Sequence, residues 1–136
     1  MPTITRFEDI EAWKTARELT QMVYSLTEQG HFGKDFGLKN QIQRAYVSIM
    51  SNIAEGFESR TQGQFIEYLG HSKASAGEVR CQLYIAMDLK YLTQEQFKHV
   101  FDLADKASRQ IPRFIDYLET HPQSRRVREQ GSEYEI

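Results

Sequence analysis

Apolar residues recur along the chain at the three- and four-residue spacing of α-helices, in four long stretches separated by short breaks. The stretch from Leu38 to Phe57 is apolar on two sides of the helix that it predicts. A helix of this kind is normally buried, so we expect it to contact more than the core of its own bundle. The first apolar strip is Leu38, Ile42, Ala45, Ile49, Ile53 and Gly56, and the second is Val47, Met50 and Ala54. A narrow polar band lies between them: Gln41, Arg44, Ser48, Ser51, Asn52 and Glu55.

The other three stretches each carry one main apolar face, which predicts helices at about residues 7–29, 62–89 and 93–119, beside the helix at 37–57. Thr61 with Gln64, and Thr93 with Gln96, have the residue types of a capping box, which marks the start of a helix. Gly30 is placed to end the first helix, and residues 31–37 are expected to form a connector. No segment alternates with period two for long enough to suggest a strand. The pattern predicts an all-α protein, an antiparallel up-down-up-down four-helix bundle over residues 1–120, with a polar tail at 121–136.

Composition and charge are those of an ordinary globular domain. The chain has 136 residues and a net charge of -2, so a nucleic-acid site would need local clustering of cations or repetition of one patch in an oligomer. The single cysteine, Cys81, excludes an intrachain disulfide and is expected to be inert packing within a helix. The N-terminus has no basic segment followed by an apolar one, and no apolar run is long enough to span a membrane. We therefore expect a cytoplasmic protein with no membrane partner.

The polar band has a counterpart on the third predicted helix. A short turn joins the second and third helices, so they should pack antiparallel, with residue numbers that sum to about 122 at the same height. This register sets Arg44 level with Glu78, and Ser48 level with Ser75. Asn52 is level with His71 in the same register. Arg44 and Glu78 could form a charge-assisted pair, and we interpret the band as polar contacts that hold helices or subunits together.

The run QIQRAYVSIMSNIAEGF, residues 41–57, closely resembles the signature of the 23S rRNA intervening-sequence protein family, also called the four-helix bundle protein family. Residues 7–17 resemble the family's N-terminal pattern, and the pattern around Ser75 and Glu78 is similar to it as well. The resemblance covers roughly residues 7–118. Met50 stands where the family often has proline, and Ala74 stands where glycine is common. The residues that match in one register are Arg44, Ser48, Asn52, Ala54, Glu55 and Gly56.

The resemblance implies a bacterial four-helix bundle that assembles into a ring-like homopentamer and has a link to nucleic acid. Many members are encoded within insertions of large ribosomal RNA genes. A related branch serves as the accessory protein of diversity-generating retroelements, where it binds the reverse transcriptase and nucleic acid. The resemblance gives a structural or assembly role to the motif residues Arg44, Ser48, Asn52, Glu55, Gly56, Ser75 and Glu78.

Two function classes stay open. The first is a non-enzymatic homo-oligomer that associates with ribosomal RNA or other nucleic acid, in which a ring repeats one weak patch several times. The second is a protein-interaction scaffold with no nucleic-acid role, which the extra apolar strips on the first two helices would also support. The candidate nucleic-acid cations are Lys34, Lys39, Arg125, Arg126 and Arg128. Glu129, Glu133 and Glu135 partly offset the tail arginines.

A metal enzyme of the ferritin-like type is disfavoured by residue spacing. A di-iron bundle needs Glu-x-x-His pairs that project inward. This chain has Glu-x-x-x-His instead, at Glu67/His71 and at Glu95/His99. We therefore predict no catalytic residue, no cofactor, no metal and no small-molecule substrate.

Overall fold

The computed structural model describes residues 4–121, and within this range the chain forms helices and no strand. Four long helices make up most of it: α1 (Glu11–Thr27), α3 (Phe36–Glu58), α4 (Gln62–Asp88) and α5 (Gln94–Thr120). A short 3-10 helix, η1 (Phe7–Asp9), precedes α1, and the five-residue helix α2 (Gly30–Lys34) lies between α1 and α3. The predicted all-α class and bundle packing are confirmed.

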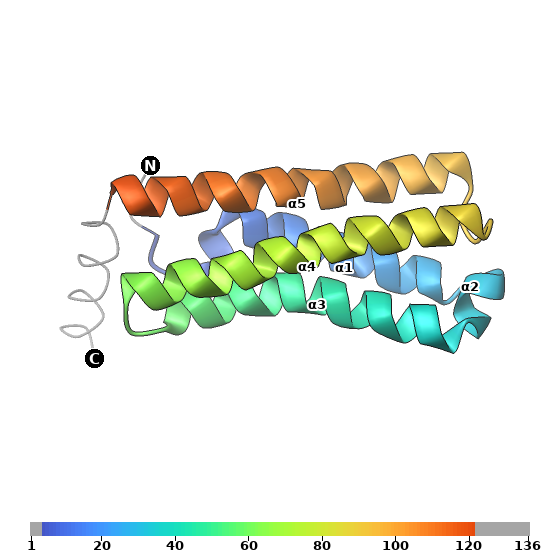
Figure 1. The fold of residues 1–136 in the computed structure, drawn as a ribbon, viewed down its shortest axis with the longest axis horizontal. Helices are drawn as coiled ribbons and strands as arrows, with labels where there is room; N and C mark the ends of the chain where they lie inside the picture. The colour runs from blue at the N-terminus through green and yellow to red at the C-terminus, as the bar shows by residue number, and fades with distance from the viewer. Residues whose placement is uncertain (1–3, 122–136) are drawn as a thin grey trace.

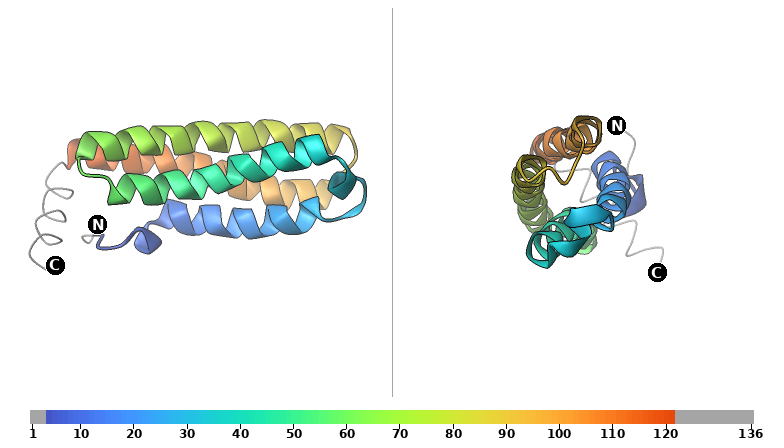
Figure 2. Two further views of the ribbon diagram at one scale, coloured as in Figure 1. Left: turned by 90° about the horizontal axis from the view of Figure 1, so that it is seen from below. Right: turned by 90° about the vertical axis from the view of Figure 1, so that its right-hand side faces the viewer.

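Successive long helices run in opposite directions, as the colour gradient of Figure 1 shows. Each packs on two neighbours: α3 on α1 and α4, and α5 on α4 and α1. The view along the bundle in Figure 2 shows the four helices surrounding a common centre. Helix α2 and the α4–α5 connection lie at one end of the bundle, whereas η1 and the last turn of α5 lie at the other.

The core is built from the apolar stripes that the sequence predicts, because each helix turns its stripe toward the common centre. All the predicted positions of the α1 seam and of the main α3 strip are buried, and the α4 stripe is buried from Phe65 to Ala86. In α5 the predicted stripe is buried only in part. Ala107 and Phe114 join the buried set, whereas the expected positions Phe97, Phe101, Ser108 and Ile115 are half-buried. The shared core residues of the first two helices are Ala12, Ala16, Leu19, Val23 and Leu26 with Leu38, Ile42, Ala45, Ile49, Ile53 and Gly56.

Two predicted boundaries at the N-terminal side were wrong. The helix expected at 7–29 is interrupted at Ile10, whose backbone is extended (φ -73°, ψ 122°) and whose side chain is buried. The expected connector 31–37 contains α2, because Phe32 is buried and stacks on Tyr91 with ring centroids 5.3 Å apart. In both cases one buried apolar side chain fixes a local conformation that helical periodicity does not reveal.

The helix starts follow the capping chemistry of the sequence. Both capping boxes are present, Thr61 with Gln64 on α4 and Thr93 with Gln96 on α5. Asp35 caps α3: its Oδ1 accepts from the backbone N–H of Leu38 at 3.1 Å, and its Oδ2 accepts from the Tyr91 hydroxyl at 2.9 Å. Since Tyr91 lies in the α4–α5 connection, this carboxylate joins two loops at one end of the bundle.

Helix α5 includes Pro112 and continues past it to Thr120. In residues 4–121, none of the helices combines the length and apolarity that a membrane span requires.

Candidate functional site

The α3–α4 contact is made close by small side chains. Gly56 has no room for a methyl group, because a Cβ there would lie 2.7 Å from Tyr68 Cβ and 2.9 Å from Phe65 Cδ1. The buried Ser72 hydroxyl donates to the carbonyl of Ile49 at 2.7 Å, which ties the two backbones together. Small residues therefore let α3 and α4 approach closely along the face that holds the family motif.

The polar band lies beside this contact. The Ser75 hydroxyl donates to Ser48 Oγ at 2.9 Å, which confirms the predicted register at this level. Ser48 Oγ also accepts from Asn52 Nδ2 at 2.8 Å. His71 is not joined to Asn52: it is exposed on α4 and lies 4.0 Å from Glu67. Glu55, the remaining polar motif residue, is exposed.

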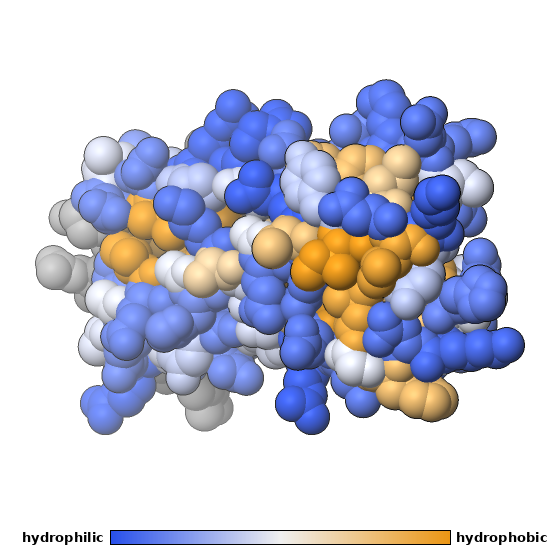
Figure 3. Space-filling view, turned by 45° about the vertical axis from the view of Figure 1, so that its right-hand side comes forward, coloured by the Kyte–Doolittle hydropathy of each residue, from blue (hydrophilic) through white to orange (hydrophobic). Residues whose placement is uncertain are grey.

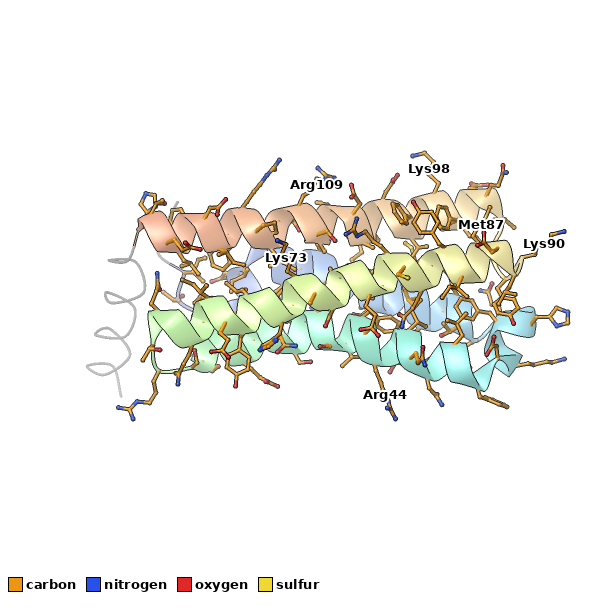
Figure 4. The ribbon with its side chains drawn as sticks, viewed as in Figure 1. Arg44, Lys73, Met87, Lys90, Lys98 and Arg109 are labelled. Atoms are coloured by element: carbon orange, nitrogen blue, oxygen red, sulfur yellow. The ribbon has the colours of Figure 1, made fainter. Side chains whose placement is uncertain are left out.

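The predicted pair of Arg44 with Glu78 does not form within the described chain. In residues 4–121 no ion pair joins the two side chains, and Glu78 instead accepts from Gln82 Nε2 at 3.2 Å. Figure 4 shows Arg44 pointing away from α4. The reason is rotational: Ser48 faces α4, and Arg44, one turn earlier, is turned about 40° further outward. The two charges share a height but point to the solvent from different helices.

Exposed apolar side chains gather on the outer face of α4. Tyr84, Ile85 and Leu89 are 54%, 44% and 52% exposed. Ala74 and Cys81, on the same outer side of the helix, are also exposed. We call this row of Ala74, Cys81 and Ile85, with Tyr84 and Leu89 beside it, the α4 ridge. The space-filling view of Figure 3 shows a continuous apolar area on this side of the molecule, toward the end that carries α2.

The α4 ridge was not among the predicted surfaces, because extra apolar strips were expected on the first two helices only. The signal was available, since Ala74, Cys81 and Ile85 recur at i, i+7 and i+11, opposite the core stripe. Cys81 lies within a helix as expected, but the prediction that it is packed was wrong, because its side chain is exposed.

A hollow lined by both polar and apolar side chains lies between α1 and α3. Tyr24 and Val47 are 43% and 39% exposed, and they flank a shallow hollow of about 400 Å³. We call it the α1–α3 hollow; its lining is Tyr24, Asn40, Gln43, Arg44 and Val47. Other members of the predicted outer strips are partly covered within the chain: the Trp13 ring packs edge-on against Phe7 at 5.2 Å, and Met50 Sδ accepts from the Thr20 hydroxyl at 3.4 Å.

Two of the candidate nucleic-acid residues, Lys34 and Lys39, lie in the described part of the chain. Lys34 is exposed on α2, whereas Lys39 forms an ion pair with Glu28 at 3.0 Å and its side chain is only 19% exposed. Arg125, Arg126 and Arg128 lie outside the described residues. They follow α5, which ends at the opposite end of the bundle from α2.

The residues considered for metal binding lie on the surface. Glu67, His71, Glu95 and His99 are exposed on α4 and α5 and do not project into the bundle. Across residues 4–121, no three His, Cys, Asp or Glu side chains come close enough together to hold a metal ion.

Comparison with known proteins identifies the family. A comparison with curated proteins gives no match. A crystal structure of a protein with unknown function from the S23 ribosomal protein family of Bacteroides thetaiotaomicron VPI-5482 is similar at a TM-score of 0.71 and 22% identity, over 77% of this chain and 95% of that chain. This likeness shows the shared fold. The family model described as 23S rRNA-intervening sequence protein matches residues 8–113, and the chain therefore belongs to this family.

Proposed function

We propose that the chain is a non-enzymatic helical-bundle protein that assembles with copies of itself into a ring-like homopentamer and associates through it with ribosomal RNA or another nucleic acid. The observation that carries the proposal is the exposure of the large apolar side chains of the α4 ridge. The number of subunits follows from the family resemblance.

The size of the exposed apolar surface favours assembly over a free monomer. Full burial of a Leu, Ile or Val side chain is worth about 1.5–3 kcal/mol. Tyr84, Ile85 and Leu89 are each about half exposed, so covering them supplies several kcal/mol by the same measure. Association itself costs at least about 4 kcal/mol, so a stable contact has to cover most of the α4 ridge.

Association with RNA rests on the family description and on repetition. The net charge of -2 gives one subunit no general attraction for phosphates. A ring would repeat the Lys34 end of the bundle and the tail arginines once per subunit, and multivalent contacts strengthen binding without any new contact type. The same near-neutral charge favours the second candidate function, a protein-interaction scaffold with no nucleic-acid role.

The test is a titration of the purified protein with fluorescent structured RNA at low and at physiological salt, with light scattering to give the mass of the assembly. Binding that weakens steeply with salt supports RNA association, because released counterions make phosphate contacts salt-dependent. Lys34→Ala, Lys39→Ala, Arg125→Ala and Arg126→Ala should then weaken it, and Lys106→Ala on the exposed side of α5 serves as the control. An assembled protein that binds no RNA even at low salt supports the scaffold function instead. A monomer at every concentration contradicts the assembly.

A further inference from the structure

We propose that the α1–α3 hollow binds one unpaired nucleotide of a single-stranded RNA segment. The Tyr24 ring stacks on the base, and Arg44 contacts a phosphate. The side-chain amides of Asn40 and Gln43 form hydrogen bonds with the edge of the base. This inference rests on the RNA association proposed above and deepens it, because it names the part of the RNA that is recognised and the residues that recognise it.

The lining of the hollow combines three kinds of group that bind nucleotides. It contains an aromatic ring, two amides and a guanidinium, and none of its five residues is acidic. Proteins that recognise single-stranded RNA stack the bases on aromatic side chains, form hydrogen bonds with the base edges and contact phosphates with arginine. The volume of about 400 Å³ lies within the range of small-ligand sites. Because the hollow is shallow, it suits one nucleotide of a longer chain better than a free small molecule.

The aromatic wall of the hollow is fixed in place and partly open. The Tyr24 ring packs edge-on against the ring of Tyr46, with centroids 5.2 Å apart and 73° between the two planes. Tyr46 is fully buried, whereas Tyr24 is 43% exposed. A base that stacks on the exposed part of Tyr24 therefore meets a ring that is already held, so stacking orders few additional groups.

The amides of the hollow have hydrogen-bonding capacity left over. Gln43 Nε2 donates to Thr27 Oγ1 at 3.0 Å, which fixes the orientation of the amide. Within residues 4–121, no donor reaches the Gln43 carbonyl oxygen, and the exposed Asn40 side chain forms no hydrogen bond. A carbonyl acceptor and a complete amide thus remain available, and the edge of a base presents the matching donors and acceptors.

The guanidinium of Arg44 also has no counter-charge inside the chain. Among the described residues it belongs to none of the ion pairs. Figure 4 shows its side chain projecting from α3 into the solvent. An arginine with all its donors free at the rim of a hollow without carboxylates is suited to a phosphate, which it can contact through two parallel hydrogen bonds.

Further cations lie on both sides of the hollow. Lys39 is one turn before Gln43 on the same side of α3, although its ion pair with Glu28 at 3.0 Å offsets part of its charge. Arg17 is two turns before Tyr24 on the same side of α1, and it is exposed. A single strand that lies in the hollow therefore meets a cation in either direction.

An unpaired nucleotide fits this chain better than a duplex. Binding to a duplex depends chiefly on many phosphate contacts, and a chain with a net charge of -2 offers few of them. Stacking on an aromatic ring and hydrogen bonds to a base edge do not depend on net charge, and both require a base outside a duplex.

The first experiment compares a fluorescently labelled single-stranded RNA with the same strand paired to its complement, with fluorescence anisotropy as the readout. The single strand should bind more tightly than the duplex. Tyr24→Ala should raise the dissociation constant for the single strand about tenfold, because one stacked base contributes about that factor. Tyr24→Phe retains the ring and should bind like the wild type. Circular dichroism verifies that both variants remain helical, since Tyr24 also packs on Tyr46.

The second experiment measures the dependence of single-strand binding on salt. Arg44→Ala should weaken binding and reduce the slope of log K against log salt by about 0.7, the value for one phosphate contact with a single strand. Arg44 is exposed, so its removal leaves the core intact. Arg60→Ala removes the same charge from the turn between α3 and α4, at an exposed position, and should change neither quantity.

The outcomes separate this inference from the proposed function. A wild-type protein that binds no RNA even at low salt overturns RNA association and the nucleotide site together. RNA binding that Tyr24→Ala and Arg44→Ala leave unchanged overturns the site alone, as does a duplex that binds as tightly as the single strand. Light scattering should give both variants the mass of the wild type. A variant that loses assembly would show instead that the hollow is a contact between copies, which also overturns the site.

Discussion

Lys90 ends α4 in a backbone conformation that suits glycine. Its φ is 63°, and the N–H groups of Lys90 and Tyr91 donate back to the carbonyls of Met87 and Ala86, both at 2.9 Å. This is the Schellman arrangement, which is usually built with glycine at the left-handed position. A side chain there costs about 1–2 kcal/mol, part of which the greater freedom of glycine in the unfolded chain cancels.

Lys90→Gly should therefore raise the free energy of unfolding by about 0.5–1 kcal/mol. Urea denaturation followed by circular dichroism measures it. The matched control is Lys73→Gly in the middle of α4, where the same change should lower stability by about 1 kcal/mol. If both variants lose stability equally, the left-handed turn is not strained in solution.

Tyr46 gives the chain a dependence on alkaline pH. Its side chain is fully buried, and burial raises the pKa of its phenol far above the ordinary 10.0. The folded protein thus keeps the phenol neutral at pH values at which the unfolded chain would release the proton. The stability that this provides is complete below pH 10 and falls as the pH rises above it.

The melting temperature of the wild type should decline above about pH 10, and Tyr46→Phe should decline less steeply because it has no buried phenol to ionise. Melting curves between pH 7 and pH 11, read as the difference between the two proteins, measure the effect. A parallel decline of both proteins would show that other groups control alkaline unfolding.

Single residues also mark where the sequence stops being informative. The core stripes follow from spacing, since only one face of each helix can reach the centre. Tyr46 lies at the edge of the α3 stripe, and its full burial depends on Tyr24 of α1, whose ring lies 5.2 Å away. The Arg44–Glu78 prediction had the correct height but the wrong direction, because register fixes the level of a side chain and not its rotation about the helix.

At the scale of elements, α3 and α4 form the most extensive contact of the bundle, and Gly56 lies where the two helices approach closely. A Cβ at this position would lie inside normal contact distance of Tyr68 and Phe65. Gly56→Ala should therefore lower the free energy of unfolding by about 1–3 kcal/mol, despite the higher helix propensity of alanine.

Thermal unfolding measures this loss, and Gly63→Ala provides the control. At Gly63, in the first turn of α4, an added Cβ would lie 4.0 Å from Thr61 Oγ1, so the change should be neutral or slightly stabilising. A Gly56→Ala variant as stable as the control would mean that the helices separate at little cost.

Helix starts were predictable where the sequence contains capping residues. Helices α4 and α5 start within one residue of their expected positions. In each capping box the Thr and the Gln three residues later accept hydrogen bonds from each other's backbone N–H groups. The break at Ile10 and the short helix α2 were not predictable from periodicity. Both depend on side chains, Ile10 and Phe32, that find their place in a core formed by distant helices.

At the scale of the whole molecule, the self-assembly proposed above would make stability depend on protein concentration. A partner that binds only the folded chain raises its apparent stability by mass action. The melting temperature of the wild type should thus rise as protein concentration rises, whereas that of Ile85→Arg should stay constant. Differential scanning calorimetry over a hundredfold concentration range measures this, and a constant wild-type melting temperature would contradict self-assembly.

The candidate function could be predicted only in outline at this scale. The motif around Arg44 to Gly56 identifies the family, and the family identifies the fold. The α4 ridge was missed because small and apolar residues give the same sequence pattern whether they pack against another helix or face the solvent. Only the packing of α4 between α3 and α5 shows which side of α4 no other helix covers.

Cys81 makes the solvent exposure of the α4 ridge directly measurable. It is the single cysteine of the chain and it is exposed, so a thiol reagent labels one defined position without any engineering. Its alkylation rate therefore measures how often this face of the helix is open to solvent. A small fluorophore attached there would place one probe on the α4 ridge of each copy. Energy transfer between probes would then detect neighbouring copies in the proposed assembly.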